Sequence, residues 1–235
     1  MYSPTLGLLL LDTQFPRPPG DLGLAESYSV PVRRAMVHGA WPALVVQSKA
    51  GLRKARLVEP FQNAVRQLRR EGAIAIATSC GFLVLLQREL QATVDVPVET
   101  SSLLQLPGLL EAENQVGVLT IHAAQLGQEH LRCAGVPRER LRDVLVEGVD
   151  PSGEFANAIL GNRASMDLTR AQADVVAAAM RLKAQAPQLS TVVLECTNMP
   201  PYAHAITAAT GLRTISLLNS KRLFKPFATV PASKP

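Results

Sequence analysis

The chain has few aromatic residues and few cysteines, and both shortages exclude classes of function. Aromatic side chains make up 4% of the 235 residues, too few for the stacking platforms that bind single-stranded nucleic acid. The three cysteines, Cys80, Cys133 and Cys196, are odd in number and form no CxxC pair. They therefore predict neither a zinc site nor a disulfide framework, and they favour a reducing, cytoplasmic location. We expect no bound metal and no nucleic-acid partner.

Long hydrophobic runs are also missing. The leucine-rich stretch at 6–11 has no basic residue before it and is ended by Asp12, unlike the apolar region of a signal peptide. No stretch reaches the roughly 18–20 apolar residues that a membrane-spanning helix needs. The GxGxxG, Walker A and GxSxG motifs are absent as well, which argues against the nucleotide and nucleophile sites that they mark. We therefore expect a soluble protein with no cofactor and no membrane partner.

The residues that are present suit a globular protein with a large core. Hydrophobic residues account for 47% of the chain and charged residues for 18%, with a net charge of +5. Short apolar runs alternate with segments of helical periodicity along the whole chain, which predicts an α/β fold with parallel sheets flanked by helices. The predicted strands cover 6–11, 32–37, 73–80, 94–98, 116–121, 143–149, 191–196 and 214–218. The predicted helices cover 59–70, 82–91, 101–113, 123–133, 169–184 and 202–210.

The pattern restarts near Val116 and so divides the chain into two similar halves. We predict an N-terminal lobe at 1–112, a C-terminal lobe at 113–218 and a tail at 219–235 that packs back on the first lobe. Residues 221–235 of this tail are expected to pack loosely. Two pseudo-symmetric α/β lobes place a pocket at their interface. A homodimer is the default expectation for the assembly.

Two of the cysteines occupy matching places in these halves. Cys80 closes the apolar run that begins at Ala73, and Cys196 closes the run that begins at Thr191. Both fall at the carboxyl end of a predicted parallel strand, the edge of an α/β sheet where ligands bind. A helix start after each cysteine offers N–H groups that favour a thiolate and a bound carboxylate. One such cysteine alone would be an ordinary core residue, whereas the matched pair predicts an active site; Cys133 lies on a helical face and is predicted to be structural.

Polar residues are predicted at the same sheet edges. Asp12 and Thr13 end the first strand, where they either contact a substrate or cap the loop. Glu195 precedes Cys196 on the predicted strand, so the alternation of side chains turns it away from the thiol and predicts a salt bridge. His122 ends another strand, and His204 lies near the start of the helix after Cys196; the default interpretation of His204 is a surface position.

These segments resemble the aspartate/glutamate racemase superfamily, whose members work without pyridoxal phosphate and which also contains hydantoin racemases, maleate isomerases and arylmalonate decarboxylases. The resemblance rests on three segments, namely Leu10-Leu11-Asp12-Thr13, Thr78-Ser79-Cys80-Gly81 and Glu195-Cys196-Thr197-Asn198. It implies two lobes with the substrate between them, and Cys80 and Cys196 as the two acid/base catalysts. It also implies that Thr78, Ser79, Thr197 and Asn198 help to bind the substrate carboxylate. Asp12, Thr13 and Gly81, which lie at the same strand ends, complete the predicted substrate-binding set.

The resulting hypothesis is a cofactor-independent racemase or epimerase that acts at the α-carbon of a small carboxylate, such as an amino acid. One cysteine removes the α-proton and the other returns a proton on the opposite face. Two alternatives stay open: cis–trans isomerisation of an unsaturated dicarboxylate by a nucleophilic cysteine, and ligand binding without turnover. Secondary candidates for substrate contact are Arg17, Thr120, His122 and His204.

Overall fold

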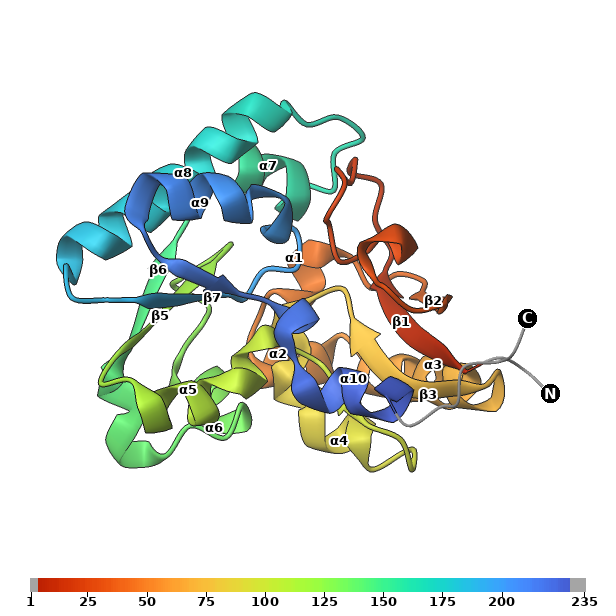
Figure 1. The fold of residues 1–235 in the computed structure, drawn as a ribbon. Helices are drawn as coiled ribbons and strands as arrows, with labels where there is room; N and C mark the ends of the chain where they lie inside the picture. Colours follow the sequence, from red (N-terminus) through yellow and green to blue (C-terminus); the bar gives the residue numbers. More distant parts are fainter. Residues whose placement is uncertain (1–3, 229–235) are drawn as a thin grey trace, which may run out of the picture.

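The computed structural model describes residues 4–228, which form two lobes of the same design. Each lobe holds a four-stranded parallel sheet, with strand order β2-β1-β3-β4 in the first and β6-β5-β7-β8 in the second. Counted within its own lobe, the second order is the same as the first. The prediction of an α/β fold with two pseudo-symmetric lobes is therefore confirmed (Figure 1).

The first sheet is built on a central strand that is buried on both faces, β1 (Thr5–Leu11). Such burial explains why the β1 sequence is an unbroken apolar run without alternation. The other strands of this sheet are β2 (Val32–Val37), β3 (Ala73–Thr78) and β4 (Val98–Glu99). The helices up to residue 112 are α1 (Pro42–Val45), α2 (Lys49–Lys54), α3 (Val58–Arg70), α4 (Gln87–Gln91) and α5 (Leu106–Ala112).

The second sheet repeats this plan around its own central strand, β5 (Val116–Thr120). Its other strands are β6 (Val144–Gly148), β7 (Thr191–Leu194) and β8 (Arg213–Ile215). The helices of the second half are α6 (Gln128–Cys133), α7 (Glu154–Leu160), α8 (Leu168–Gln185), α9 (Ala203–Thr210) and α10 (Lys221–Ala228). Helices α8 and α9 cover one face of this sheet and α5 lies on the other (Figure 1).

The main differences from the predicted elements concern short helices. Helices α1, α2 and α7 were not predicted, because four to seven residues are too few to show a 3.6-residue period. The helix expected at 82–91 begins as the 3-10 helix Gly81–Leu86, whose side chains are all buried. The helix expected at 123–133 begins only at Gln128. In the described part of the chain, no helix combines the length and the apolar character needed to cross a membrane.

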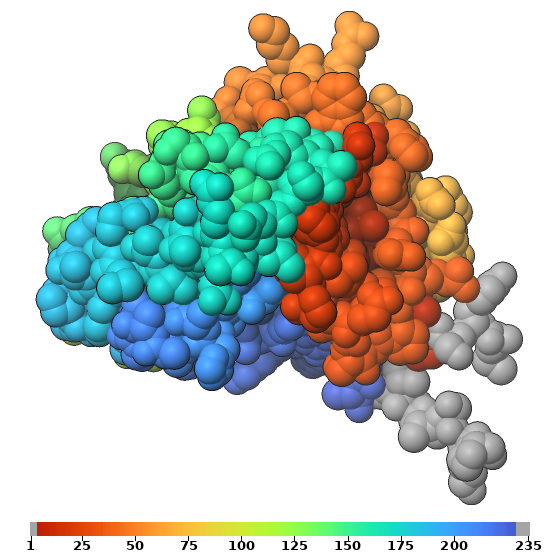
Figure 2. Space-filling view, turned by 90° about the horizontal axis from the view of Figure 1, so that it is seen from above, coloured from red at the N-terminus to blue at the C-terminus, as the bar shows by residue number. Residues whose placement is uncertain are grey.

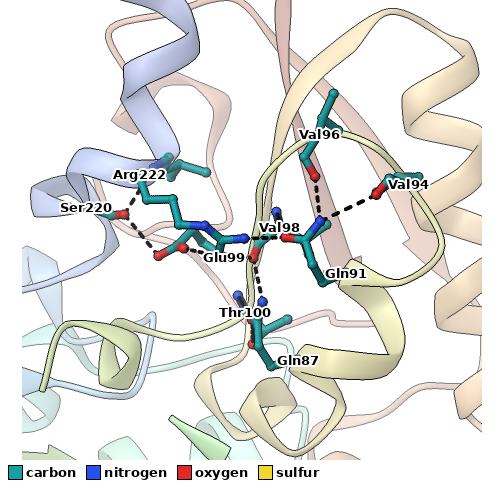
Figure 3. Close-up of polar contacts among 10 residues, drawn as sticks. Gln87, Gln91, Val94, Val96, Val98, Glu99, Thr100, Ser220 and Arg222 are labelled. Atoms are coloured by element: carbon teal, nitrogen blue, oxygen red, sulfur yellow. Dashed lines mark hydrogen bonds and ion pairs between the residues drawn. The ribbon is translucent and has the colours of Figure 1, made fainter. Parts of the chain in front are cut away.

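The last helix returns to the first lobe, where it packs against β3 and β4. The Arg222 guanidinium donates to Glu99 Oε1 at 2.7 Å, and Ser220 Oγ donates to Glu99 Oε2 at 3.0 Å (Figure 3). Leu217 and Leu223 add apolar contacts with the sheet. The prediction of loose packing is therefore wrong for the tail up to Ala228. The buried Glu99 carboxylate needs a positively charged partner, and the Arg222 guanidinium on the last helix supplies it. The rest of the predicted tail, 229–235, lies outside the described residues.

Hydrogen bonds join the two lobes near the ends of their central strands. Figure 2 shows the N-terminal segment (red) packed directly against segments of the second half (teal and blue). Thr197 Oγ1 donates to the carbonyl of Ser79 at 2.6 Å, and the Leu22 N–H donates to the carbonyl of Thr197 at 3.1 Å. The Asn162 side chain accepts from the Gln14 N–H at 2.7 Å. The lobe interface thus passes directly over the cysteine turns.

Candidate active site

Both strand-end cysteines lie at the point where the strand order of each sheet reverses direction. Cys80 is the second residue after β3, and Cys196 is the second residue after β7. In each lobe these strands neighbour the central strand, so the turns sit at the switch points where α/β sheets bind ligands. Both thiols are buried, and they line one narrow cavity between the lobes with an open volume of about 20 Å³. That volume is about the size of one water molecule, so a larger ligand requires the lobes to move apart.

The cavity wall is mostly apolar, with a few polar groups near the thiols. Its apolar part includes Phe15, Phe82 and Ile121. The predicted site residues that reach the cavity are Thr13, Ser79, Cys80, Gly81, Cys196, Thr197 and Asn198. The structure therefore brings together seven residues from two turns and one loop that are far apart in the sequence.

Cys80 is bordered by backbone N–H groups that favour its thiolate. Burial raises the pKa of the Cys80 thiol to about 12, and the nearby charge of Glu195 contributes to the increase. Hydrogen bonds from the N–H groups of Phe82 and Leu83 act in the opposite direction. The expectation of a lowered thiol pKa is therefore wrong for this conformation, because the loss of water outweighs the helix N–H groups.

Cys196 has a different neighbour. Its thiol donates to Asn198 Oδ1 at 3.5 Å, and Asn198 Nδ2 donates to Asp21 Oδ2 at 2.7 Å. The Asp21 carboxylate thus fixes the orientation of the amide and keeps its oxygen toward the sulfur. Burial raises the pKa of Cys196 well above its usual value, and Glu195 again adds to the effect. Cys196 is held in the form of a thiol that donates a hydrogen bond.

Several side chains expected to bind a substrate carboxylate are used within the protein instead. The Thr78 hydroxyl lies beneath the turn and donates to the carbonyls of Thr100 at 2.8 Å and Cys80 at 3.1 Å. Ser79 Oγ accepts from the Leu11 N–H at 3.2 Å. Thr197 is committed to the Ser79 carbonyl. These hydroxyls shape the turns and join the lobes, so the donors nearest the thiols are backbone N–H groups.

The first strand end is arranged differently from the prediction. Asp12 Oδ2 accepts from the Gly39 N–H at 2.9 Å, away from the cavity wall. Thr13 does line the cavity, and its hydroxyl accepts from Arg17 Nη2 at 3.0 Å. Arg17 also forms an ion pair of 2.6 Å with the buried Asp21 and lies 4.6 Å above the Phe15 ring. Arg17 is therefore bound to Asp21 rather than free to pair with a substrate.

The remaining secondary candidates do not meet the thiols. His204 is exposed on α9. His122 is half-buried and lines two surface hollows outside the cysteine cavity. Thr120 is fully buried and donates to Glu195 Oε2 at 2.7 Å. Of these three residues, only Thr120 is connected to the cavity, through its carboxyl partner.

Glu195 is the residue that sequence reasoning placed wrongly. It is fully buried and lines the cavity with the two cysteines, and within residues 4–228 it forms no ion pair. β7 ends at Leu194, so strand alternation does not fix the side-chain directions of Glu195 and Cys196, although the Glu195 N–H still donates to the Leu119 carbonyl. Burial raises the pKa of Glu195 to about 8, although the Thr120 hydrogen bond opposes the shift. The available signal was an acidic residue directly before a predicted catalytic cysteine. The sequence alone does not show whether a basic side chain pairs with this acid in the folded protein.

Asp21 was missed as well. It is buried, and its carboxylate accepts from Arg17, the Gly23 N–H and Asn198. The loop that carries it is rich in proline and glycine and matches no ligand motif. Across residues 4–228 no group of three or more His, Cys, Asp or Glu side chains is arranged to hold a metal ion.

Sequence comparison finds similar proteins along nearly the whole chain, although no family model matches. The dimethylsulfoniopropionate lyase of Durusdinium sp. clade D is 29% identical over 228 residues, which cover 94% of this chain and 73% of that protein. Dimethylsulfoniopropionate lyase 7 of Emiliania huxleyi (strain CCMP1516) is 27% identical over 232 residues, covering 94% of this chain and 66% of that protein. The chain thus spans about two thirds to three quarters of the length of these two curated relatives.

Solved structures show the same architecture at lower identity. Glutamate racemase from Francisella tularensis subsp. tularensis SCHU S4, in complex with D-glutamate, has a TM-score of 0.59 and 14% identity over 98% of this chain and 84% of that one. A double mutant of arylmalonate decarboxylase in its liganded form also has a TM-score of 0.59, with 15% identity over 92% and 88% of the two chains. The chain therefore shares the two-lobed fold of glutamate racemase and arylmalonate decarboxylase.

Proposed function

We propose that this protein is a cofactor-independent lyase that removes the α-proton of a small carboxylate and expels a substituent from the β-carbon. The observation that carries the proposal is the buried cavity lined by both strand-end thiols. The similarity to proteins named dimethylsulfoniopropionate lyase supports dimethylsulfoniopropionate as the substrate. The racemase hypothesis from the sequence shares the first step, the loss of the α-proton.

The elimination balances with a single base. A cysteine thiolate forms an S–H bond with the α-proton, and the electron pair of the C–H bond becomes the Cα=Cβ double bond. The bond from Cβ to sulfur breaks, and its electron pair leaves with neutral dimethyl sulfide. The products are dimethyl sulfide and acrylate, and the thiol then returns its proton to water.

Cys80 is the better candidate for the base. The N–H groups of Phe82 and Leu83 stabilise a negative charge on its sulfur, whereas the Cys196 thiol donates to Asn198. A sulfonium cation in the cavity lowers a thiol pKa, because opposite charges stabilise one another where little water is present. Burial therefore keeps both thiols protonated, and the positive charge of the substrate favours the thiolate that removes its α-proton.

The wall of the cavity suits both ends of such a substrate. Phe15 and Phe82 line it, and aromatic rings attract onium cations. Negative charge that develops at the α-carbon spreads onto the carboxylate oxygens, where hydrogen-bond donors in a dry site are most effective. The backbone N–H groups of Phe82, Leu83 and Asn198 already bond to the thiols, so the donor to the carboxylate is another polar group of the cavity wall.

Racemisation is the second candidate, and the paired thiols favour it. Elimination needs one base, whereas racemisation needs a base and an acid on opposite faces of the α-carbon. In that reaction the Cys80 thiolate takes the α-proton and the Cys196 thiol returns one. Isomerisation of an unsaturated dicarboxylate would instead pass through a covalent adduct on one cysteine.

The test follows dimethyl sulfide by headspace gas chromatography and α-deuterium incorporation by mass spectrometry in deuterated water. Dimethylsulfoniopropionate is compared with a panel of amino acids, hydantoins and dicarboxylates. We expect dimethyl sulfide release that is lost in Cys80→Ser and kept in the control variant Cys133→Ser. Deuterium uptake by an amino acid without dimethyl sulfide release would favour racemisation. A wild-type protein that neither releases dimethyl sulfide nor exchanges any α-proton would refute the proposal.

A further inference from the structure

The Glu195 carboxyl lies at the junction of the two cysteine turns, and its two oxygens have different surroundings. Thr120 Oγ1 is 2.7 Å from Glu195 Oε2. The same hydroxyl accepts from the His122 N–H at 3.4 Å, so its own hydrogen is free to point to Oε2. Oε1 is buried and has no hydrogen-bond partner among the described residues. The Thr120 hydrogen bond therefore leaves Oε1 as the oxygen that carries a proton when the group is neutral.

Gly81 shows where this free oxygen lies. A Cβ atom at Gly81 would lie 2.3 Å from Glu195 Oε1 and 2.3 Å from the Glu195 carbonyl oxygen. Oε1 is thus packed directly over the residue that follows Cys80, while Glu195 itself precedes Cys196. Gly81 is required by this contact between the lobes, and both Gly81 and Glu195 line the cavity of the two thiols.

Among the described residues, no cation neutralises a charge on this carboxyl. Arg17, the basic side chain that acts on Cys80, is bonded to Asp21. The titratable groups next to Glu195 are the two thiols, with Asp21 acting on Cys196 from farther away. An ionised Glu195 raises the pKa of both thiols. A neutral Glu195 therefore favours both a thiolate and a bound carboxylate in this site.

We infer that Glu195 acts as a neutral carboxylic acid whose Oε1–H donates a hydrogen bond to the carboxylate of the ligand in the cysteine cavity. This inference deepens the proposed function and rests on it for the nature of the ligand. The acid donates to the oxygens that gain negative charge when the α-proton leaves, and it is strongest there because water is excluded. The proton of the acid stays on Oε1. The hydrogen bond therefore adds no bond making or bond breaking to the elimination.

The experiment measures binding rather than turnover. Isocaproate has the shape of dimethylsulfoniopropionate but lacks the positive charge and the leaving group. Its affinity is measured by titration calorimetry between pH 6 and pH 9.5 for the wild type, Glu195→Gln and Glu99→Gln. In Glu195→Gln the amide keeps its oxygen on Thr120 and places an N–H at the position of Oε1, so this variant donates at every pH. Glu99 is a matched buried glutamate far from the cavity, bonded to Ser220 and Arg222 (Figure 3).

We expect the wild-type affinity to be constant at low pH and to fall about tenfold per pH unit once Glu195 ionises near pH 8. Glu99→Gln should show the same break, and Glu195→Gln should bind with no break. Thr120→Val should move the break to higher pH, because the lost hydrogen bond lowers the pKa of Glu195 in the wild type. Thr120→Ser should restore it, which a purely structural role would not predict.

A wild-type affinity without a break, a break that persists in Glu195→Gln, or no isocaproate binding at pH 6 would overturn the inference. Dimethyl sulfide release with pH-independent isocaproate binding would leave the proposed function standing and remove the role of Glu195. Isocaproate binding that depends on Glu195, without any α-proton exchange or dimethyl sulfide release, would support the role of Glu195 and refute the proposed function. The two ideas therefore fail separately.

Discussion

The two cysteine turns occupy the same position in the topology of their lobes, but different polar groups surround the two thiols. Ser79-Cys80-Gly81 follows β3, and Glu195-Cys196-Thr197 follows β7. The first residue of each turn continues the sheet in the same way, since the Ser79 N–H donates to Leu9 and the Glu195 N–H donates to Leu119, both at 2.9 Å. The backbone is thus repeated, whereas the side chains before and after the cysteine are not.

The side-chain difference separates the tasks of the two turns. The first turn has a small hydroxyl, a glycine and a 3-10 helix with N–H groups near the sulfur, which together favour negative charge on Cys80. The second turn has a buried acid and an amide that accepts from the thiol. In the proposed mechanism, one turn therefore supplies the base and the other turn supplies proton donors.

The largest effect is expected at the cysteines themselves. Cys80→Ser should lower kcat for dimethyl sulfide release by roughly a thousandfold or more, because a hydroxyl is a far weaker acid than a thiol and supplies no base. Cys196→Ser should lower it less, by roughly ten- to a hundredfold, since it keeps a hydroxyl beside Asn198. Steady-state kinetics on both variants measure the difference. Equal losses would mean that the two turns do not differ in the reaction.

A second prediction concerns the contact between the turns. Gly81→Ala should lower the free energy of unfolding by about 3 kcal/mol, because the new Cβ would lie 2.3 Å from a backbone oxygen of Glu195 that cannot move aside. Gly108→Ala is the matched control, since nothing lies within 4 Å of a Cβ there and the residue is inside α5. It should be neutral or slightly stabilising. Urea denaturation of both variants provides the comparison, and an undamaged Gly81→Ala would contradict the packing of Glu195 on this turn.

The third prediction uses the pH dependence of stability. Folding raises the pKa of Glu195 from about 4.5 to about 8, so the folded state binds an extra proton between these values. The stability that this proton contributes is complete below pH 4.5 and is lost as the pH rises toward 8. The wild type should therefore lose a few kcal/mol more than Glu195→Gln between pH 5 and pH 8. Parallel urea titrations for the two proteins would show instead that Glu195 is ionised when folded.

The smallest effect is expected at the residue that corresponds to Glu195 in the first turn. Ser79→Ala removes an acceptor for the Leu11 N–H at 3.2 Å, which should cost about 1 kcal/mol of folding free energy. It should leave the pH profile of isocaproate binding unchanged, because Ser79 does not titrate. A shifted profile in Ser79→Ala would remove the contrast between the two turns.

The strands and the two-lobe plan were predictable because a strand buried on both faces is a continuous apolar run, as β1 and β7 show. Helices α1, α2 and α7 were not, because their few residues carry no periodic signal.

The cysteine pair was predictable from matched positions, whereas the groups that tune it were not. Glu195 meets Thr120 across 75 residues of sequence, and Asp21 meets Asn198 across 177. Local patterns cannot show which carboxyl keeps a cation and which is left without one. Arg17 pairs with Asp21 and not with a substrate for the same reason. The charge balance of the site depends on tertiary contacts, and the thiol pKa values follow from it.

The return of the last helix to the first lobe has a consequence for how the chain matures on the ribosome. Leu6, Leu8, Ala75 and Ala77 form one side of the first sheet, and Leu217 and Leu223 cover it. The lobe that is synthesised first therefore keeps part of this apolar face uncovered until residues 217–228 have emerged. The second lobe has its own strands and helices by then, so the lobe that starts first is completed last.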